Sequence, residues 1–148
     1  MTAHEKIHTI VSECLHVRLR LINRLIGGIY DRTLAPHGIK CTQFTILAAV
    51  SAMETTTSRQ LGKVLHMDPS TVSRTLNILK KNHWLDTAPS GDGKILNIHI
   101  TPAGLDKLEQ AYPEWEKAQK EALEILGQET FDTLVSTGTR YLEENING

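Results

Sequence analysis

The sequence predicts a mainly α-helical protein that contains one short β-hairpin. Apolar residues recur at helical spacing near both ends of the chain, and two helices with clear N-terminal capping residues adjoin near its middle. Two short apolar runs flank a loop that contains Gly91 and Gly93, which predicts the hairpin. The 148 residues, 40% hydrophobic and 22% charged, are enough to bury a core. We therefore expect residues 1–148 to form a single domain.

The N-terminal part is expected to form a long amphipathic helix from about Ile7 to Tyr30, because its apolar residues recur mostly at steps of three and four. The Pro36-His37-Gly38 segment interrupts this pattern. The nearly all-apolar stretch Gln43–Met53 then predicts a second helix that lies buried.

A pair of short helices follows. Thr57 and Gln60 have the spacing of a capping box, which predicts a helix that ends near His66. Asp68 can accept the free amides of the next helix, and Pro69 suits its first position because proline has no amide to lose there. Two helices joined by so short a turn form a helix-turn-helix.

The second helix of this motif has two distinct faces. Val72, Leu76 and Leu79 are spaced to face the core. The opposite face is polar near its start and basic near its end, and it consists of Ser70, Thr71, Ser73, Arg74, Asn77, Lys80 and Lys81.

Two strands are expected at Trp84–Ala88 and Ile95–Ile100, with Leu96, Ile98 and Ile100 facing inward. The loop at 89–93 makes them a hairpin, which in this position is a wing. The fold class is therefore mainly α, a winged helix-turn-helix with a small β-hairpin wing over residues 40–100.

The C-terminal part predicts two further helices. Thr101 and Pro102 begin one that Pro113 is expected to kink, and the last runs from about Gln128 to Asn145. The terminal segments 1–35 and 101–148 carry more apolar surface than a motif of about 60 residues can cover. We expect them to intertwine as the dimerisation region of a homodimer; a closed monomeric core is the alternative.

Several classes of protein are disfavoured. No stretch reaches the roughly 18 uninterrupted apolar residues of a membrane span, and the N-terminus lacks the pattern of a signal peptide, so we expect a cytoplasmic protein without a membrane partner. Two cysteines are too few for a disulfide framework or a structural zinc site. No nucleophile elbow or phosphate loop is present. We expect no enzymatic activity, cofactor or metal.

The distribution of charge favours a nucleic-acid partner despite a net charge of −1. Residues 1–105 hold 12 Lys and Arg against 7 Asp and Glu, whereas residues 106–148 hold 4 against 10. The helix-turn-helix itself, residues 57–83, carries five basic residues and only Asp68 as an acid. A winged helix used only for protein contact would not need this charge, but it remains the alternative.

From Lys40 to Gly104 the chain resembles the MarR (multiple-antibiotic-resistance regulator) family of winged-helix transcription regulators. The resemblance is carried by Gln43-Phe44 with Leu47, by Arg59–Gly62, by Met67–Leu76 and by the run from Leu96 to Thr101-Pro102-Ala103-Gly104. It implies a homodimer that binds a pseudo-palindromic operator in double-stranded DNA. The recognition helices would enter successive major grooves and the wings would approach the minor grooves. We expect the outcome to be repression.

The resemblance also assigns DNA-contacting residues. Arg74 would read guanine with its planar fork, and Ser70 and Thr71 would hold a phosphate at the helix start. The wing has Asp92-Gly93-Lys94 where the family usually has Asp-x-Arg, which leaves insertion of Lys94 into the minor groove open. The expected DNA-binding set is Arg59, Ser70, Thr71, Ser73, Arg74, Asn77, Lys80 and Lys94.

Members of this family commonly respond to a small aromatic or lipophilic acid or to cysteine oxidation. For an acid, Tyr30, Phe44, Tyr112 and Trp115 would line the site, and Arg18, Arg20 or Arg24 would pair with the carboxylate. For redox sensing the candidates are Cys14, on the apolar side of the first helix, and Cys41, whose pKa Lys40 would lower. A repressor released by a small-molecule effector is the main hypothesis, and a thiol-based regulator of the same fold is the alternative.

Overall fold

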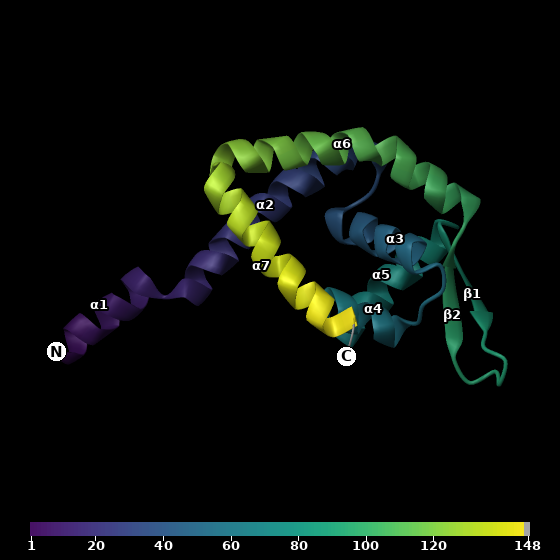
Figure 1. Cartoon of the computed structure of the whole chain (residues 1–148), viewed down its shortest axis with the longest axis horizontal. Coiled ribbons are helices and arrows are strands. Elements are labelled where there is room, and N and C mark those ends of the chain that lie inside the picture. The colour runs from purple at the N-terminus through teal and green to yellow at the C-terminus, as the bar shows by residue number, and fades with distance from the viewer. Residues whose placement is uncertain (147–148) are drawn as a thin grey trace.

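The computed structural model describes residues 1–146, without the side chains of residues 143, 145 and 146. It confirms a mainly helical winged helix-turn-helix with one two-stranded antiparallel sheet (Figure 1). No described helix is both long and apolar enough to cross a membrane. The elements in chain order are α1 (Ala3–Glu13), α2 (Leu15–Leu34), η1 (Ala35–His37), α3 (Cys41–Met53), α4 (Ser58–Leu65), α5 (Pro69–Lys81), β1 (Leu85–Pro89), β2 (Leu96–Ile100), α6 (Pro102–Leu126) and α7 (Gln128–Ile146).

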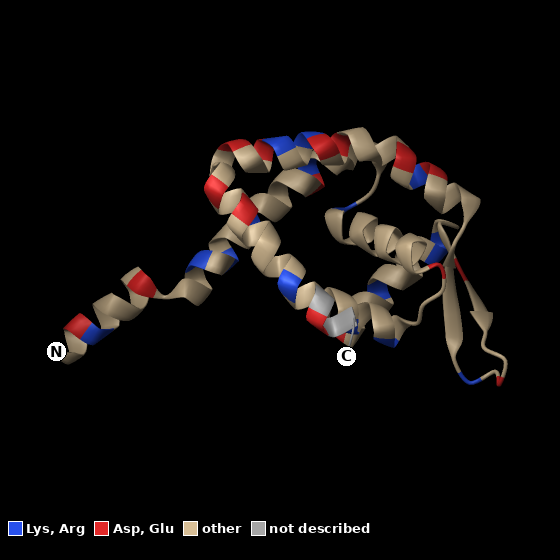
Figure 2. Cartoon of the chain, viewed as in Figure 1, with Lys and Arg blue, Asp and Glu red and all other residues tan. Residues whose placement is uncertain are grey.

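Helix α3 lies at the centre of the core, as its apolar sequence predicts. It carries no charged residue (Figure 2), and Ile46, Leu47 and Val50 are fully buried. Apolar residues of α4, α5, both strands and α6 complete this core; they are Leu61, Val72, Leu76, Leu79, Leu85, Ile98 and Ala111. The other side of α3 is open to solvent at Thr45, Ala48 and Ala52, so this helix is buried along one side only.

The prediction of a single long N-terminal helix is wrong, because the helix is interrupted at Cys14 and forms α1 and α2. Cys14 has an extended backbone, with ψ at 109°. The Arg18 guanidinium donates hydrogen bonds to the carbonyls of Val11, at 2.6 Å, and Ser12. These carbonyls belong to the end of α1, where no helical amide is left to bond them. Cys14 therefore lies partly exposed in a bend rather than on the apolar side of a continuous helix.

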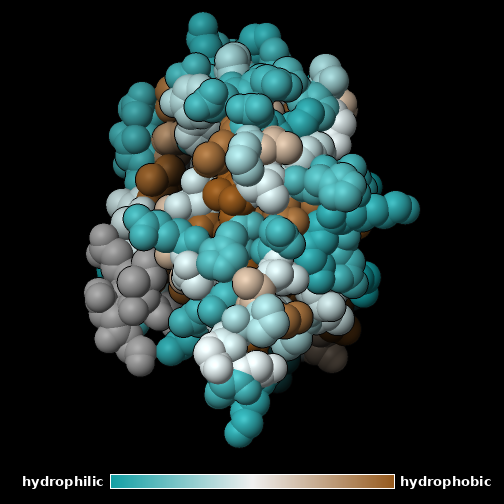
Figure 3. Space-filling model, turned by 90° about the vertical axis from the view of Figure 1, so that its right-hand side faces the viewer, coloured by the Kyte–Doolittle hydropathy of each residue, from teal (hydrophilic) through white to brown (hydrophobic). Residues whose placement is uncertain are grey.

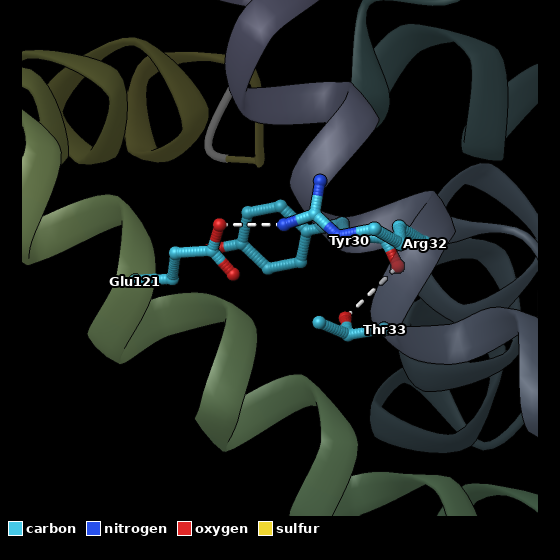
Figure 4. Close-up of polar contacts among 4 residues, drawn as sticks. All are labelled: Tyr30, Arg32, Thr33 and Glu121. Atoms are coloured by element: carbon cyan, nitrogen blue, oxygen red, sulfur yellow. Dashed lines mark hydrogen bonds and ion pairs between the residues drawn. The ribbon is translucent and has the colours of Figure 1, made fainter.

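Helices α2 and α6 lie side by side and are joined by polar contacts (Figures 1 and 4). The Tyr30 hydroxyl donates to the side-chain carbonyl of Gln119. The Arg32 guanidinium lies 2.5 Å from the Glu121 carboxylate. Within α2, the Thr33 hydroxyl donates to the Tyr30 carbonyl at 3.1 Å. Because Arg32 and Glu121 are both solvent-exposed, their pairing orients the helices more than it stabilises them.

Helix α6 begins where the sequence predicts and runs through Pro113 to Leu126, bending along its length (Figure 1). Thr101 caps it by accepting the Gly104 amide at 3.0 Å. After Gly127, α7 turns back and lies against α4.

The hairpin pairs Leu85 with Ile100 at its base and Pro89 with Leu96 at its far end. Ile98 is buried and exchanges backbone hydrogen bonds with Thr56, which ties β2 to the segment before α4. Leu96 is 54% exposed, contrary to the expected inward orientation. The far end of the hairpin projects beyond the helices (Figure 1), so its apolar alternation has no core to face.

Candidate nucleic-acid interface

Helix α5 is held to the body by one face and leaves the other open to solvent. Val72 and Leu79 are fully buried, and Leu76 nearly so. The opposite face projects short polar and basic side chains. Four of the predicted residues on it, Ser70, Ser73, Arg74 and Asn77, are exposed, and Lys80 is partly exposed. Figure 3 views the molecule from the hairpin side, where hydrophilic residues surround recessed apolar ones.

The start of α5 is already occupied by a carboxylate. Asp68 accepts hydrogen bonds from the Ser70 hydroxyl at 2.6 Å, the Thr71 hydroxyl at 2.6 Å and the Thr71 amide at 2.9 Å. These bonds hold the pKa of Asp68 well below its usual range. Both hydroxyls predicted to hold a phosphate thus donate to Asp68, and an incoming phosphate would meet its negative charge. Their role as direct phosphate ligands stays a prediction.

Arg74 lies one helical turn after Thr71, and its side chain is exposed to solvent. Its guanidinium donates to the Thr71 hydroxyl oxygen at 3.3 Å. Among the residues that the structure describes, no carboxylate lies within ion-pairing distance of it. Most of its donors therefore remain available to an acceptor outside the protein.

A small cavity of about 140 Å³ lies between α5 and the hairpin. It brings the predicted Ser73, Asn77 and Lys80 together with Ser58 and Thr87, which the sequence analysis did not single out. Ser58 is the first residue of α4, a position with a free backbone amide that marks it as a candidate phosphate contact. Thr87 reaches the cavity only because the hairpin folds back on α5, and no local sequence signal indicates this.

The tip of the hairpin is organised by Asp92. Its carboxylate accepts the Ser90 hydroxyl at 2.6 Å and the Lys94 amide at 3.0 Å, and these bonds lower the pKa of Asp92. Gly93 between them has a φ of +71°, which glycine adopts without strain. Lys94 is exposed at this tip, and Arg59 is exposed on α4. Whether either touches DNA stays a prediction.

The residues predicted to line one effector site lie in two separate grooves. Phe44, Tyr112 and Trp115 line a groove of about 490 Å³ between α3 and α6. Tyr30 lines another, of about 420 Å³, between α2, α6 and α7. Arg18 lines neither, because its guanidinium closes the end of α1. The expected pairing of Arg18 with an effector carboxylate is therefore not supported by its position.

The expected lowering of the Cys41 pKa by Lys40 is wrong. Burial raises the pKa of the Cys41 thiol, and the nearby Asp31 carboxylate raises it further, while a hydrogen bond with Thr45 opposes both. Asp31 also accepts the Cys41 amide at 2.8 Å. A raised pKa leaves less thiolate at neutral pH, and the thiolate is the reactive form.

We expect Cys41 in a Cys14→Ser variant to react with iodoacetamide more slowly at pH 7.5 than free cysteine does, and its rate to rise as pH increases through and beyond 9. Mass spectrometry of timed samples measures this rate. The same experiment on Cys41→Ser reports Cys14, which lies in the α1–α2 bend and is also partly exposed. Faster reaction of Cys41 than of free cysteine at pH 7.5 would contradict the raised pKa.

Among the described residues, no group of three His, Cys, Asp or Glu side chains is placed to hold a metal ion.

Comparison with known proteins agrees with this arrangement. A family model described as "MarR family" matches residues 37–95, which include α3, the helix-turn-helix and the first strand and loop of the hairpin. The multiple antibiotic resistance protein MarR of Salmonella typhimurium is 27% identical over 93 residues, which cover 62% of this chain and 65% of that protein. An uncharacterized HTH-type transcriptional regulator of Bacillus subtilis, YwoH, is 24% identical over 68% of this chain and 73% of that protein. The match thus spans just under two thirds of the Salmonella relative.

Two solved structures share the fold over most of the chain. A MarR variant from E. coli, complexed with operator DNA, superposes with a TM-score of 0.78 at 20% identity and covers 89% of this chain and 96% of its own. The transcriptional regulator MOSR of M. tuberculosis, in complex with DNA, has a TM-score of 0.74 at 26% identity and covers 86% of this chain and 96% of its own. The family model, the relatives and the fold agree, so this chain is similar to MarR-family regulators in its helix-turn-helix region and shares their fold.

Proposed function

We propose that this protein is a sequence-specific regulator of transcription that binds double-stranded DNA through α5. The observation that carries the proposal is the division of α5 into two faces. Its apolar face is buried in the core, and its polar, basic face is exposed. A helix of this size fits the major groove, where base edges present distinct patterns of donors and acceptors.

The charges around α5 support a DNA partner rather than a protein partner. Lys80 and Lys81 lie in its last turn, and Arg59 and Lys63 lie on α4 beside it. Asp68, the only acid in residues 57–83, is held by the helix it caps. The E. coli MarR variant and M. tuberculosis MOSR, which share this fold, were solved with DNA. The wing then approaches the flanking backbone or minor groove, with Lys94 at its tip.

We propose further that two copies of the chain form the DNA-binding unit. Helix α1 buries none of its residues, and Ile7, Ile10 and Val11 are each at least 60% exposed. Leu15 and Leu21 of α2 are equally open. Apolar faces of this extent are normally covered, and a second copy presents matching ones on its own terminal helices. A symmetric pair would place two α5 helices on half-sites about one DNA turn apart.

As a cytoplasmic dimer seated over a promoter, the protein would act as a repressor by steric block, and a small molecule would release it. DNA release could be controlled by a small molecule or by oxidation of a thiol. The raised pKa of Cys41 favours the small molecule, because it leaves less of the reactive thiolate. A winged helix used only for protein contact would not need an unpaired Arg74 among basic neighbours.

Selection of bound sequences from a random duplex pool tests the proposal, followed by affinity measurement on the selected duplex. We expect a pseudo-palindromic site, two chains per duplex, and an affinity that falls by about 10³-fold or more between 50 and 200 mM salt. A scrambled duplex of the same composition is the control, and we expect it to bind more weakly. Absence of duplex binding even at 50 mM salt would leave the protein-contact alternative.

A further inference from the structure

The groove between α3 and α6 is lined by aromatic and apolar side chains and one carboxylate. It encloses about 490 Å³, a size typical of small-molecule sites. Phe44 at its floor is buried, whereas Tyr112 at its wall is 49% exposed. The Tyr112 and Trp115 rings stack with centroids 5.5 Å apart and planes inclined by 27°. The lining consists of Phe44, Thr45, Ala48, Leu108, Glu109, Tyr112 and Trp115.

Glu109 is the one charged residue among the lining residues that the structure describes. It lies three residues before Tyr112 and six before Trp115 on α6, and all three side chains line the groove. The nearest basic residue in sequence, Lys107, donates to the His37 carbonyl at 3.0 Å and lies over the Trp84 ring at 5.1 Å. It is therefore already engaged outside the groove.

The arginines expected to bind an acid lie elsewhere. Arg18 closes the end of α1, and Arg20 and Arg24 line a separate small depression on α2. An anionic ligand in the α3–α6 groove would meet the Glu109 carboxylate with no cation among the described lining residues to balance it. Loss of water from an unpaired anion in such a place is costly.

We propose that this groove binds a lipophilic cation with aromatic groups, such as an arylammonium or arylphosphonium ion, rather than an acid. The faces of Trp115 and Tyr112 attract a cation through their electron-rich rings, and Glu109 balances its charge. Phe44, Ala48 and Leu108 cover its apolar parts. A role for this cation as the effector rests on the proposed function, whereas its binding does not.

The second groove, between α2, α6 and α7, is a weaker candidate for the same ligand. Its lining contains no charged residue among those described, and its walls include Leu19, Leu134 and Val135. These residues belong to the exposed apolar surface that we assign to the second copy of the chain.

Two ions of nearly equal size and shape but opposite charge test the proposal directly: tetraphenylphosphonium and tetraphenylborate. Calorimetric titration of the full chain without DNA is expected to give saturable binding of the cation, about tenfold or more tighter than that of the anion. In a Trp84→Phe variant, the fluorescence of Trp115 should change on addition of the cation, which locates the site. Equal or tighter binding of the anion would overturn the proposal, as would the absence of saturable cation binding.

The Glu109→Gln variant tests the role of the carboxylate. We expect cation affinity to fall about three- to tenfold and the preference over the anion to shrink. Glu116→Gln is the matched control, because Glu116 is exposed on the same helix and does not line the groove. Equal affinities of the two variants for the cation would refute the assignment of Glu109. Affinity for the selected duplex is measured separately, so that loss of DNA binding with intact cation binding counts against the proposed function alone.

Discussion

The Arg74→Ala variant is expected to bind the selected duplex more weakly by about 1 to 3 kcal/mol per half-site, or roughly 5- to 150-fold, and to lose its preference at one base pair of each half-site. Arg74 projects from the exposed face of α5, and no carboxylate among the described residues competes for its guanidinium. Its fork can donate two parallel hydrogen bonds to guanine O6 and N7. Fluorescence anisotropy with the selected duplex and with single-base variants measures both effects.

The Arg74→Lys variant separates charge from geometry. Lysine keeps the positive charge but lacks the planar pair of donors. We expect this variant to retain the salt dependence of the wild type and to lose the base preference. Lys80→Ala is the complementary control, because loss of a phosphate contact weakens binding to all sequences alike and lowers the salt slope by about one. Unchanged affinity and unchanged base preference in Arg74→Ala would refute the role of α5 as the recognition helix.

The Gly104→Ala variant is expected to lower the free energy of unfolding by about 1 to 3 kcal/mol, the usual cost of overpacking, and we expect the upper part of this range. A Cβ at this position would lie 2.2 Å from the Trp84 carbonyl oxygen and 2.8 Å from Cγ1 of Ile100. The first of these is a backbone atom, and it also accepts the Thr101 amide. The clash can be relieved only by moving α6 away from the base of the hairpin.

Thermal unfolding checks this effect, at about 2 to 4 °C per kcal/mol for a chain of this size. The neighbouring Ala103→Gly variant changes the same number of atoms at an exposed position of the same helical turn, and its cost should not exceed about 1 kcal/mol. We expect Gly104→Ala also to weaken DNA binding, because the hairpin and α5 would shift relative to each other. A melting temperature equal to that of the wild type would show that the junction yields more easily than its geometry indicates.

The best sequence predictions concerned features set by a few neighbouring residues. The starts of α4, α5 and α6 follow from Thr57, Asp68 with Pro69, and Thr101 with Pro102, because capping depends on groups within three residues. The central place of α3, with Phe44, Ile46, Leu47 and Val50 buried, follows from its apolar sequence. These features together were sufficient for the fold class.

The failures concerned features that depend on contacts between distant residues. The break at Cys14 is stabilised by Arg18, whose side chain reaches back over six and seven residues to the end of α1. The raised pKa of Cys41 comes from tertiary burial and from Asp31, ten residues earlier, which outweigh a hydrogen bond with Thr45. The aromatic residues expected in one effector site divide between two grooves because α2 and α3 pack on different parts of α6. Hydropathy patterns do not encode which parts of two helices meet.

The 25 residues of α6 have a mechanical consequence. At about 1.5 Å per residue the helix is a rod of roughly 37 Å, fixed at one end to the hairpin base and continuous at the other with α7. A tilt of only about 5° about one end would displace the other by roughly 3 Å. The α3–α6 groove lies along the half of the rod nearest the hairpin. A molecule that wedges into it would therefore act on a lever, and a sub-ångström adjustment there would be magnified across the subunit.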